Sequence, residues 1–371
     1  MAFGVGLRAA ERPAYSPPMK VLILGGTGFV GAHTVRAFLA EGHEVAVLSR
    51  ATSPREVLAD VADDVEWVQG DLRDAPSLER AFAGREVVVH QAGILSLWDK
   101  QSQSLYDVNV LGTRRVVDAC LKAGVRRLVY TGSVGVYAGS KDPILVDEAG
   151  APDVSRFHSF HVTSMCLAEA EVYKGIARGL EAVLLHPSLC LGRGDRNWHS
   201  SWAIVGLACL KLPVIPPGGI NVVDVLDVAR THVAAASKGT PGASYLLGGE
   251  NLTNGAWSEL LRQVLEIPKL PVVKIPRRGI HALGSVGEWV ARARGVDRGT
   301  YVTLNQALSH AMSLYWWIDD AKAARELGHG HSPIRPALKR QVEWLGEHGR
   351  LPGQGFGLKE FGETFLGMGG V

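Results

Sequence analysis

The sequence predicts an α/β protein in which helices cover both faces of a doubly wound parallel sheet. Short apolar runs alternate with amphipathic segments from residue 20 onward, as a parallel sheet requires. The first apolar run, 21–24, leads directly into closely spaced glycines. A chain of 371 residues is also long enough for a large core and a second, smaller lobe.

Six apolar segments are expected to form the strands, and the helices between them to cover the sheet. The expected strands are 21–24, 44–48, 65–68, 86–90, 127–130 and 182–185, with long helices near 105–123 and 160–178. Beyond residue 190 the pattern becomes irregular. Loops rich in Gly and Pro there separate helices near 257–265, 279–293, 321–327 and 336–347, which predicts a mostly helical C-terminal substrate lobe.

These patterns predict the domain boundaries. The sheet domain spans 19–190 and regains 221–247, and the substrate lobe comprises 191–220 and 248–350. Residues 1–18 lack the apolar core and cleavage site of a signal peptide, so they are expected to be a disordered extension. The glycine-rich segment 351–371 is expected to be a loosely attached tail.

Composition and charge exclude several classes of function. The net charge of +2, without a Lys/Arg block, gives no basic field for nucleic acid. Apolar runs are interrupted well short of a membrane span. Four cysteines without C-x-x-C spacing indicate buried thiols in a reducing compartment, so we expect a cytoplasmic protein. His158 and His161 have no third ligand at metal-binding spacing, and no metal site is expected.

The glycines after the first strand predict a dinucleotide site. Gly25, Gly28 and Gly31 follow a buried strand and open a helix. This order lets the backbone turn tightly and approach a pyrophosphate, while the helix N-terminus offers free N–H groups to it. The alternative is a glycine turn that binds nothing, which is the less favoured interpretation because strand, turn and helix occur in the required order.

Several motifs in fixed order resemble the extended short-chain dehydrogenase/reductase family, and this resemblance covers residues 19–350. It rests on the glycine turn, on Asn109-Val-Leu-Gly-Thr113, on Thr131-Gly-Ser-Val-Gly-Val-Tyr137, on His186-Pro-Ser-Leu-Cys-Leu-Gly192 and on Val225-Leu-Asp-Val-Ala229. Leu97-Trp98 and the segment 245–253 are most similar to the dihydroflavonol-reductase and 3β-hydroxysteroid-dehydrogenase branch. The resemblance implies a Rossmann fold, a small-molecule substrate and a homodimer through the helices near 105–123 and 160–178.

The resemblance also assigns the cofactor-binding residues. They are Gly25, Thr27, Gly28, Phe29, Val30, Gly31, Ser49, Arg50, Asp71, Leu72, Gln91, Ala92, Gly93, Met165, Pro187 and Ser188. A carboxylate after the second strand would bind a ribose 2′-hydroxyl and repel a 2′-phosphate. Ser49 and Arg50 stand there instead, with Arg55 nearby, which favours NADP(H) over NAD(H). The plain alternative is a solvated arginine.

The catalytic position departs from the resembled family, which uses a Tyr-x-x-x-Lys pair. Ser164 and the pair Ala168-Glu169 set the register, so His161 occupies the tyrosine position and Met165 the lysine position. Ser133 and Asn109, the other two members of the catalytic tetrad, are present. An imidazole has a pKa near 6.5 and can exchange protons without a neighbouring cation, so His161 is the candidate acid–base residue. Alternatively, His161 and Met165 merely pack together on their helix.

Apolar side chains on expected loops favour a lipophilic substrate. The candidates for the substrate pocket are Leu95, Trp98, Tyr137, Phe157, Leu189, Trp198 and Trp202, with Ile94 beside them. Arg193 and Arg196 could instead hold the diphosphate of a nucleotide sugar. His329-Gly-His331 is expected in a solvated surface turn, and Asp227 and Glu250 are expected to be structural.

Three functions are consistent with these residues. The first is an oxidoreductase that acts on a ketone or secondary alcohol of a lipophilic molecule, with His161 in place of tyrosine. The second is a non-redox isomerase, cyclase or nucleotide-sugar epimerase-like enzyme on the same fold. The third is an inactive dinucleotide-binding regulator, whose pocket would be filled by side chains.

Overall fold

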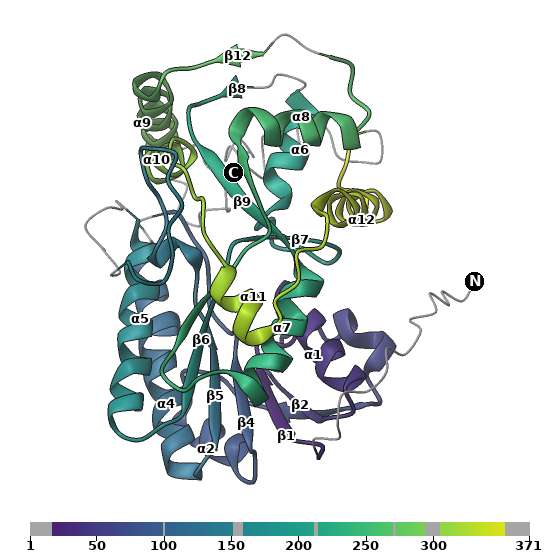
Figure 1. Cartoon of the computed structure of the whole chain (residues 1–371), viewed down its shortest axis with the longest axis vertical. Helices are drawn as coiled ribbons and strands as arrows, with labels where there is room; N and C mark the ends of the chain where they lie inside the picture. Colours follow the sequence, from purple (N-terminus) through teal and green to yellow (C-terminus); the bar gives the residue numbers. More distant parts are fainter. Residues whose placement is uncertain are drawn as a thin grey trace.

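A seven-stranded parallel sheet forms the centre of the protein (Figure 1). The computed structural model describes residues 17–98, 101–150, 159–210, 214–269, 272–293 and 305–352. The strand order is β10-β6-β5-β4-β1-β2-β3, and every neighbouring pair is parallel. The bounds are β1 (Lys20–Leu24), β2 (Glu44–Ser49), β3 (Val65–Gln69), β4 (Val87–His90), β5 (Arg127–Thr131), β6 (Ala182–Pro187) and β10 (Ser244–Leu247). The predicted fold class is confirmed.

Two helical layers cover the sheet because alternate strand residues face opposite sides. Val21 and Ile23 of β1 pack in the core formed with α1 (Phe29–Ala40), α7 (Val225–Lys238) and α11 (Ala321–Leu327). Leu22 and Leu24 pack in the core formed with α2 (Ala75–Phe82), α4 (Leu111–Ala123) and α5 (Phe160–Ala177). A sheet buried on both faces explains why its strands are continuous apolar runs rather than alternating ones.

The second lobe combines a small sheet with helices. Its sheet has the order β11-β9-β7, and a second pair joins β12 to β8. The strands are β7 (Leu189–Leu191), β8 (Val214–Ile215), β9 (Gly219–Asp224), β11 (Glu250–Thr253) and β12 (Val273–Lys274). The helices are α6 (Ser201–Leu210), α8 (Asn254–Val264), α9 (Arg277–Ala293), α10 (Gln306–Met312) and α12 (Ile334–Glu347). The sequence predicts a strand at Val222 leading into a helix, which corresponds to the end of β9. The other four strands were not predicted, because two to four residues carry no measurable periodicity.

Short irregular helices complete the connections. They are η1 (Arg55–Val61), α3 (Ser102–Leu105), the π-helical η3 (Tyr106–Val110) and η4 (Val134–Val136). The expected helix at 105–123 is therefore a π-helical turn followed by α4. The predicted extension 1–18 and tail 351–371 lie almost wholly outside the described residues.

The strand order creates a crevice at the carboxyl ends of β1 and β4. The chain leaves β1 toward β2 and β3, and then crosses back to β4 on the other side of β1. The connections after the two strands therefore diverge, and such a switch point is where parallel sheets bind ligands.

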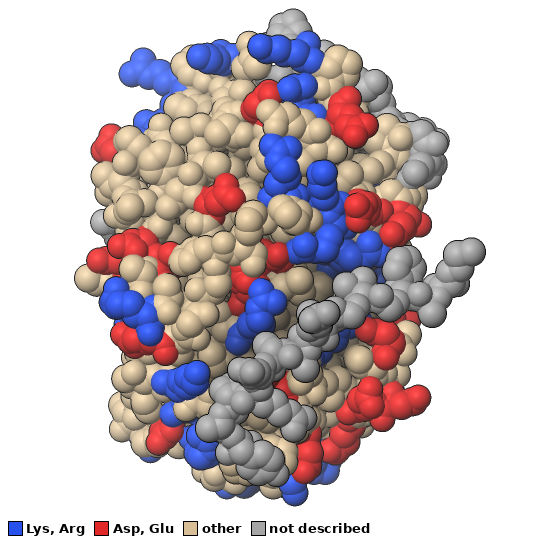
Figure 2. Space-filling view, turned by 45° about the vertical axis from the view of Figure 1, so that its right-hand side comes forward, with Lys and Arg blue, Asp and Glu red and all other residues tan. Residues whose placement is uncertain are grey.

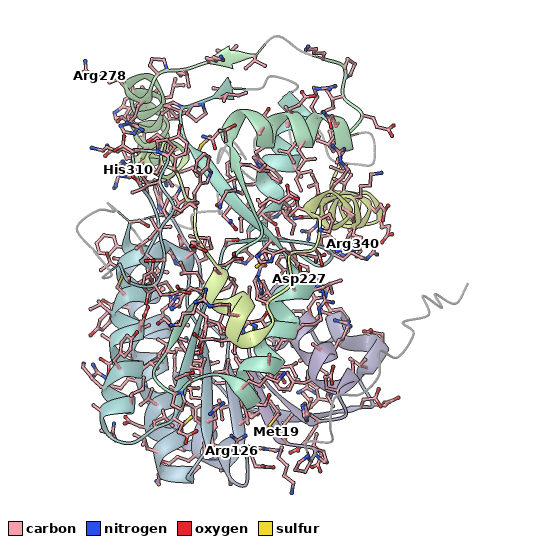
Figure 3. The ribbon with its side chains drawn as sticks, in the orientation of Figure 1. Met19, Arg126, Asp227, Arg278, His310 and Arg340 are labelled. Atoms are coloured by element: carbon pink, nitrogen blue, oxygen red, sulfur yellow. The ribbon has the colours of Figure 1, made fainter. Side chains whose placement is uncertain are left out.

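One sequence expectation about the second lobe is wrong. His329 does not lie in a solvated turn; it is buried, with Nε2 2.8 Å from the Gly248 carbonyl oxygen and Nδ1 2.7 Å from the Thr231 hydroxyl. The segment folds back onto α7, where the Asp227 carboxylate accepts hydrogen bonds from the Ser332 amide and hydroxyl. Figure 3 shows Asp227 at this junction. His331 is exposed, as expected, and contacts Asp320.

Acidic and basic side chains lie close together on the face shown in Figure 2. Exposed ion pairs of the protein include Arg193–Glu347 and Arg196–Glu56. Among the described residues, no helix has both the length and the apolar character needed to cross a bilayer.

Candidate active site

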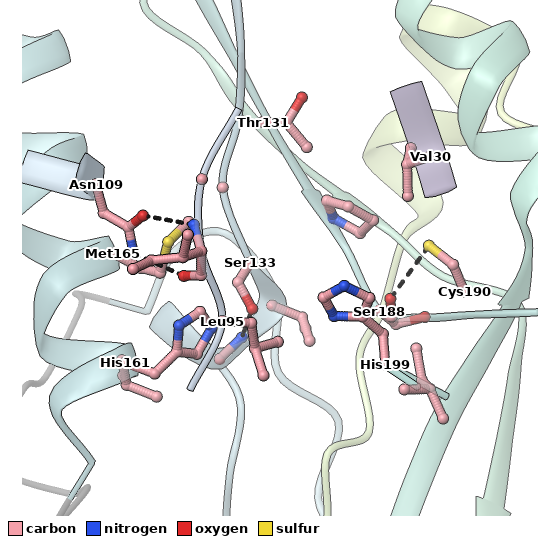
Figure 4. Close-up of a pocket in the computed structure, with 18 of the residues that line it drawn as sticks. Val30, Leu95, Asn109, Thr131, Ser133, His161, Met165, Ser188, Cys190 and His199 are labelled. Carbon is pink, nitrogen blue, oxygen red and sulfur yellow. Dashed lines mark hydrogen bonds between the residues drawn. The ribbon is translucent and has the colours of Figure 1, made fainter. Parts of the chain in front are cut away.

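One cavity of about 490 Å³ joins the glycine turn to the second lobe. Its floor comes from the carboxyl ends of β1, β4, β5 and β6, and its outer wall from the segment after β6 and from α10. It is therefore at the crevice that the strand order creates. Figure 4 shows residues from both lobes around the space.

The glycine turn makes one wall of this cavity from backbone. A Cβ atom added at Gly31 would lie 2.0 Å from the Gly25 carbonyl oxygen, and one at Gly25 would lie 2.7 Å from the Ala92 nitrogen. Gly25 also has φ +84°, which disfavours any side chain. Glycine is therefore required here for the turn, and for its close approach to the loop after β4.

Helix α1 points its N-terminus at the same space. Gly28, Phe29, Val30 and Gly31 line the cavity, and no side chain caps the helix. Its first N–H groups and the positive end of its dipole are thus available to an anion. Buried polar atoms without a hydrogen-bond partner among the described residues also lie on the lining, including Gln91 Oε1 and Ser188 Oγ. These features fit a dinucleotide that supplies a pyrophosphate and additional polar groups.

The predicted cofactor residues divide between the main cavity and its surroundings. Gly25, Gly28, Phe29, Val30, Gly31, Gln91, Ala92, Gly93, Met165, Pro187 and Ser188 line the main cavity. Arg50 and Asp71 line a neighbouring hollow instead, together with Gly70 and Arg80. Thr27, Ser49 and Leu72 line neither of these two cavities, and Leu72 packs in the core against Gly112.

The neighbouring hollow carries charged groups at the end of β2 and β3. Arg73 donates two hydrogen bonds to the Asp71 carboxylate, which lowers the pKa of Asp71 to about 2. Ser49 is buried, and its hydroxyl accepts a hydrogen bond of 3.1 Å from Arg55, whose guanidinium lies over Trp67. Arg50 is exposed at the rim. No carboxylate follows β2 directly, as the sequence indicated.

His161 and Met165 both line the cavity from the first turns of α5. His161 Nδ1 is buried and has no hydrogen-bond partner among the described residues. Burial, and secondarily His199, lower the pKa of His161 to about 4, so the imidazole is neutral at physiological pH. Ser133, at the end of β5, lines the same space, and its hydroxyl accepts a hydrogen bond from the Gly135 amide.

Asn109 fixes the backbone around His161 rather than presenting a free amide. Its side chain accepts a hydrogen bond from the Ile94 amide and donates to the Ile94 carbonyl, both at 2.9 Å. It also donates to the Ser164 hydroxyl, which in turn donates to the His161 carbonyl oxygen. The π-helical turn η3 thus connects the loop after β4 to the helix that carries His161.

Behind Ser133 lies a buried polar cluster. His186 is fully buried with its Nε2 3.8 Å from Glu169 Oε1, and Tyr137 donates a hydrogen bond of 3.2 Å to that carboxyl oxygen. Desolvation lowers the pKa of His186 to about 3 and raises the pKa of Glu169 to about 7. Gly132 provides the room, because a Cβ there would meet His186 Nδ1 at 2.6 Å.

Four predicted substrate-pocket aromatics do not line the cavity. Trp98 is buried beneath Arg292, and Tyr137 belongs to the cluster behind Ser133. Trp198 and Trp202 pack against the core of the second lobe. An aromatic loop residue can pack in a core or line a pocket, and the sequence pattern around it is the same in both cases. Leu95, Leu189 and Ile94 do line the cavity, and Phe157 lies outside the described residues.

Other lining residues were not predicted. The outer part of the cavity includes His199 and Asn197 from the loop before α6 and His310 from α10, which Figure 3 also labels. No motif surrounds these residues in the sequence, so only the fold brings them to the site. Arg193 and Arg196 are absent from the lining and pair with Glu347 and Glu56. The described residues contain no cluster of three or more metal-ligating side chains.

The profile of the NAD dependent epimerase/dehydratase family matches residues 21–248. The chain belongs to this family. Its members are also called extended short-chain dehydrogenases/reductases, and the chain is an oxidoreductase- or epimerase-type enzyme of the dihydroflavonol-reductase and 3β-hydroxysteroid-dehydrogenase branch. The resemblance seen in the sequence is thereby confirmed.

Individual relatives of this family span nearly the whole chain. A putative dihydroflavonol 4-reductase of Synechocystis sp. is 33% identical, covering 90% of this chain and 96% of its own length. Sterol demethylase protein B of Methylococcus capsulatus is 30% identical and covers 90% and 100%. The crystal structure of gox2253 superposes with a TM-score of 0.77 at 31% identity, covering 89% and 99%.

Proposed function

We propose that this family member oxidises a secondary alcohol of a lipophilic small molecule, and catalyses the reverse reduction less readily, with His161 as its acid–base residue. The observation that carries this proposal is the position of His161, which lines the same cavity as the glycine turn and Ser133. The names of two relatives, a dihydroflavonol reductase and a sterol demethylase protein, support a lipophilic substrate.

The protein's own groups suit proton transfer from an alcohol. The bound dinucleotide would supply the hydride acceptor. Ser133 would donate a hydrogen bond to the reacting oxygen, and the neutral His161 imidazole would accept the hydroxyl proton. At neutral pH His161 is in the neutral form that accepts this proton, whereas ketone reduction starts from the imidazolium, which is scarcely populated. Met165, at the family's lysine position, adds no positive charge that would lower this pKa further.

Two alternatives from the sequence are less well supported. A regulator would have its pocket filled by side chains, whereas the cavity here is open across both lobes. A nucleotide sugar needs cations for its diphosphate, but Arg193 and Arg196 are held in ion pairs away from the lining.

The decisive experiment compares turnover with cofactor binding in His161→Ala. With NADP⁺ and a panel of 3β-hydroxysteroids, flavan-3,4-diols and 2-alkanols, we expect kcat to fall by about 10²–10⁴-fold. The dissociation constant of NADPH, measured by fluorescence, should not change. His331→Ala, at the exposed histidine, is the matched control. Full turnover by His161→Ala, or NADPH binding by the wild type without turnover of any alcohol, would contradict the proposal.

We also propose NADP(H) as the preferred cofactor. Ser49 replaces the carboxylate that would repel a 2′-phosphate, and the exposed Arg50 lies at the adjoining hollow. Equal NADH and NADPH affinities would contradict this preference.

A homodimer through α4 and α5 is the proposed assembly. Phe160 and Leu167 leave half of their apolar surface exposed on α5, at 54% and 43%. Sedimentation should show a dimer that Leu167→Glu dissociates, and a wild-type monomer at micromolar concentration would exclude it.

A further inference from the structure

The loop between β7 and α6 holds His199 in place through a buried carboxylate. Asp195 is fully buried, and its Oδ1 accepts a hydrogen bond of 2.9 Å from the His199 amide. Its Oδ2 accepts from the amides and hydroxyls of Ser200 and Ser201 at 2.8–3.1 Å. Five hydrogen bonds to one desolvated carboxylate make this loop rigid, since releasing any of them leaves a buried charge underpaired.

A second element and a strained residue support the same loop. Gln341 of α12 donates hydrogen bonds of 2.7 and 2.9 Å to the Ser200 and Ser201 hydroxyls. Trp198, directly before His199, has φ +60°, a left-handed conformation that is unfavourable for a bulky residue. The Arg350 guanidinium lies 4.7 Å above the Trp198 ring. Strain that surrounding contacts maintain is typical of functional positions.

The rigid loop directs His199 into the cavity, opposite His161. Figure 4 shows the two imidazoles on opposite sides of the space, with Ser133 and Leu95 drawn between them. Burial lowers the pKa of His199, so this imidazole is also neutral at physiological pH. A neutral imidazole can donate one hydrogen bond to an oxygen.

The surroundings of His199 restrict what such a hydrogen bond could recognise. The described residues that line the cavity include no Lys, Arg, Asp or Glu. Leu189 and Ile220 provide apolar surface on the same lining, and His310 adds a further imidazole from α10. A polar group of the substrate on this wall must therefore be bound by imidazole or amide side chains within an apolar environment.

We propose that His199 is a second polar subsite, which binds an oxygen of the substrate a few bonds from the carbon that exchanges hydride. Preferred substrates are then lipophilic alcohols or ketones with a second, uncharged oxygen function, such as 3-hydroxy carboxylic esters. This inference rests on the proposed function, because it takes the oxygen between Ser133 and His161 as the reacting one.

Three alcohols with the same alkyl chain test the subsite. They are 3-hydroxydecanoate, its methyl ester and 2-nonanol, which lacks the second oxygen. With NADP⁺, the wild type should show a kcat/KM about tenfold or more higher for the methyl ester than for 2-nonanol. The carboxylate should gain less, because the described lining offers no cation to offset its desolvation. His199→Leu should lower kcat/KM for the methyl ester relative to 2-nonanol, chiefly through KM, so that the preference disappears. His199→Gln, which keeps a donor, should retain part of it.

His310→Leu is the matched control at the other imidazole. It should preserve the preference, and a loss there but not in His199→Leu would overturn the assignment. Equal kcat/KM for the three alcohols in the wild type, or an equal decrease for all three in His199→Leu, would also overturn it. Unchanged thermal melting of the variants excludes misfolding as the cause.

A binding measurement separates this proposal from the proposed function. Calorimetry of methyl 3-hydroxydecanoate with the protein–NADPH complex involves no turnover, because both ligands are reduced. Weaker binding by about tenfold in His199→Leu supports the subsite even if no alcohol is oxidised. Binding that His199→Leu leaves unchanged overturns the subsite even if oxidation depends on His161.

Discussion

The two halves of the cavity are built in different ways. Around the glycine turn the wall is backbone, and its shape depends on missing Cβ atoms at Gly25 and Gly31. Around Ser133, His161 and His199 the wall is made of side chains that project from separate elements. A backbone wall tolerates few substitutions and keeps its ligand class, whereas a side-chain wall can change its chemistry one residue at a time. On the proposed register, in which His161 and Met165 stand for the family's Tyr-Lys pair, this difference explains how the dinucleotide site is retained.

The largest loss of cofactor affinity is expected from a methyl group in the backbone wall. Gly31→Ala places a Cβ 2.0 Å from the Gly25 carbonyl oxygen, so the turn must open. NADPH binding, followed by fluorescence, should weaken by about 10–100-fold. Gly255→Ala in α8 is the control, because its nearest neighbour would be 3.8 Å away, and it should bind normally. Normal binding by Gly31→Ala would show that this wall is less constrained than its geometry implies.

In the side-chain wall, restoring the family's Tyr-Lys pair one residue at a time should show what each residue contributes to activity. His161→Tyr alone should lose about 10²-fold or more in kcat, because a phenol with a pKa near 10 is a poor base without a cation. Adding Met165→Lys should recover activity and move the pH optimum upward. Met165→Lys alone should reduce activity, since the ammonium would oppose protonation of His161. Equal activity in the single and double tyrosine variants would contradict this coupling.

Substitutions at Ser49 and Arg50, at the end of β2, test whether the neighbouring hollow binds the 2′-phosphate of the cofactor. Ser49→Asp restores a carboxylate there, which should weaken NADPH binding by about tenfold or more through repulsion of the 2′-phosphate. The affinity for NADH serves as the internal control and should stay the same or improve. Arg50→Ala should have a smaller effect in the same direction. Unchanged NADPH binding in both variants would show that the neighbouring hollow does not bind the 2′-phosphate.

A change in pH should have the smallest effect on the rate of alcohol oxidation near neutrality, and a gradual effect at lower pH. His161 has its pKa lowered to about 4 by burial, so its neutral form predominates above that value. Alcohol oxidation should therefore be flat from neutral pH down to about pH 5, and then fall by up to tenfold per unit below about pH 4. Ketone reduction needs the imidazolium, and should instead accelerate as pH decreases toward 4. Stopped-flow measurement of the hydride step in both directions, with stability checked at each pH, distinguishes this from acid unfolding. Parallel profiles in the two directions would contradict a single titrating imidazole.

The sequence by itself determined the central sheet, the glycine turn and the family. These features are local: a buried parallel strand is a continuous apolar run, and a turn that admits no Cβ requires glycine at fixed spacing. The register of Ser164 and Glu169 likewise predicts that His161 stands at the family's tyrosine position, and in the structure His161 lines the cavity. These signals need no knowledge of distant residues.

Only the tertiary structure decided which side chains face the cavity. The aromatic side chains predicted for the pocket pack elsewhere: Trp98 is buried, and Trp198 and Trp202 pack against the core of the second lobe. Tyr137 donates a hydrogen bond to Glu169, which lies beside His186 behind Ser133. His199 and His310 reached the cavity from segments more than 100 residues apart. Side-chain direction in an irregular loop depends on the partners that fix it, here the Asp195 carboxylate and Gln341, and such long-range partners leave no periodic signal in the sequence.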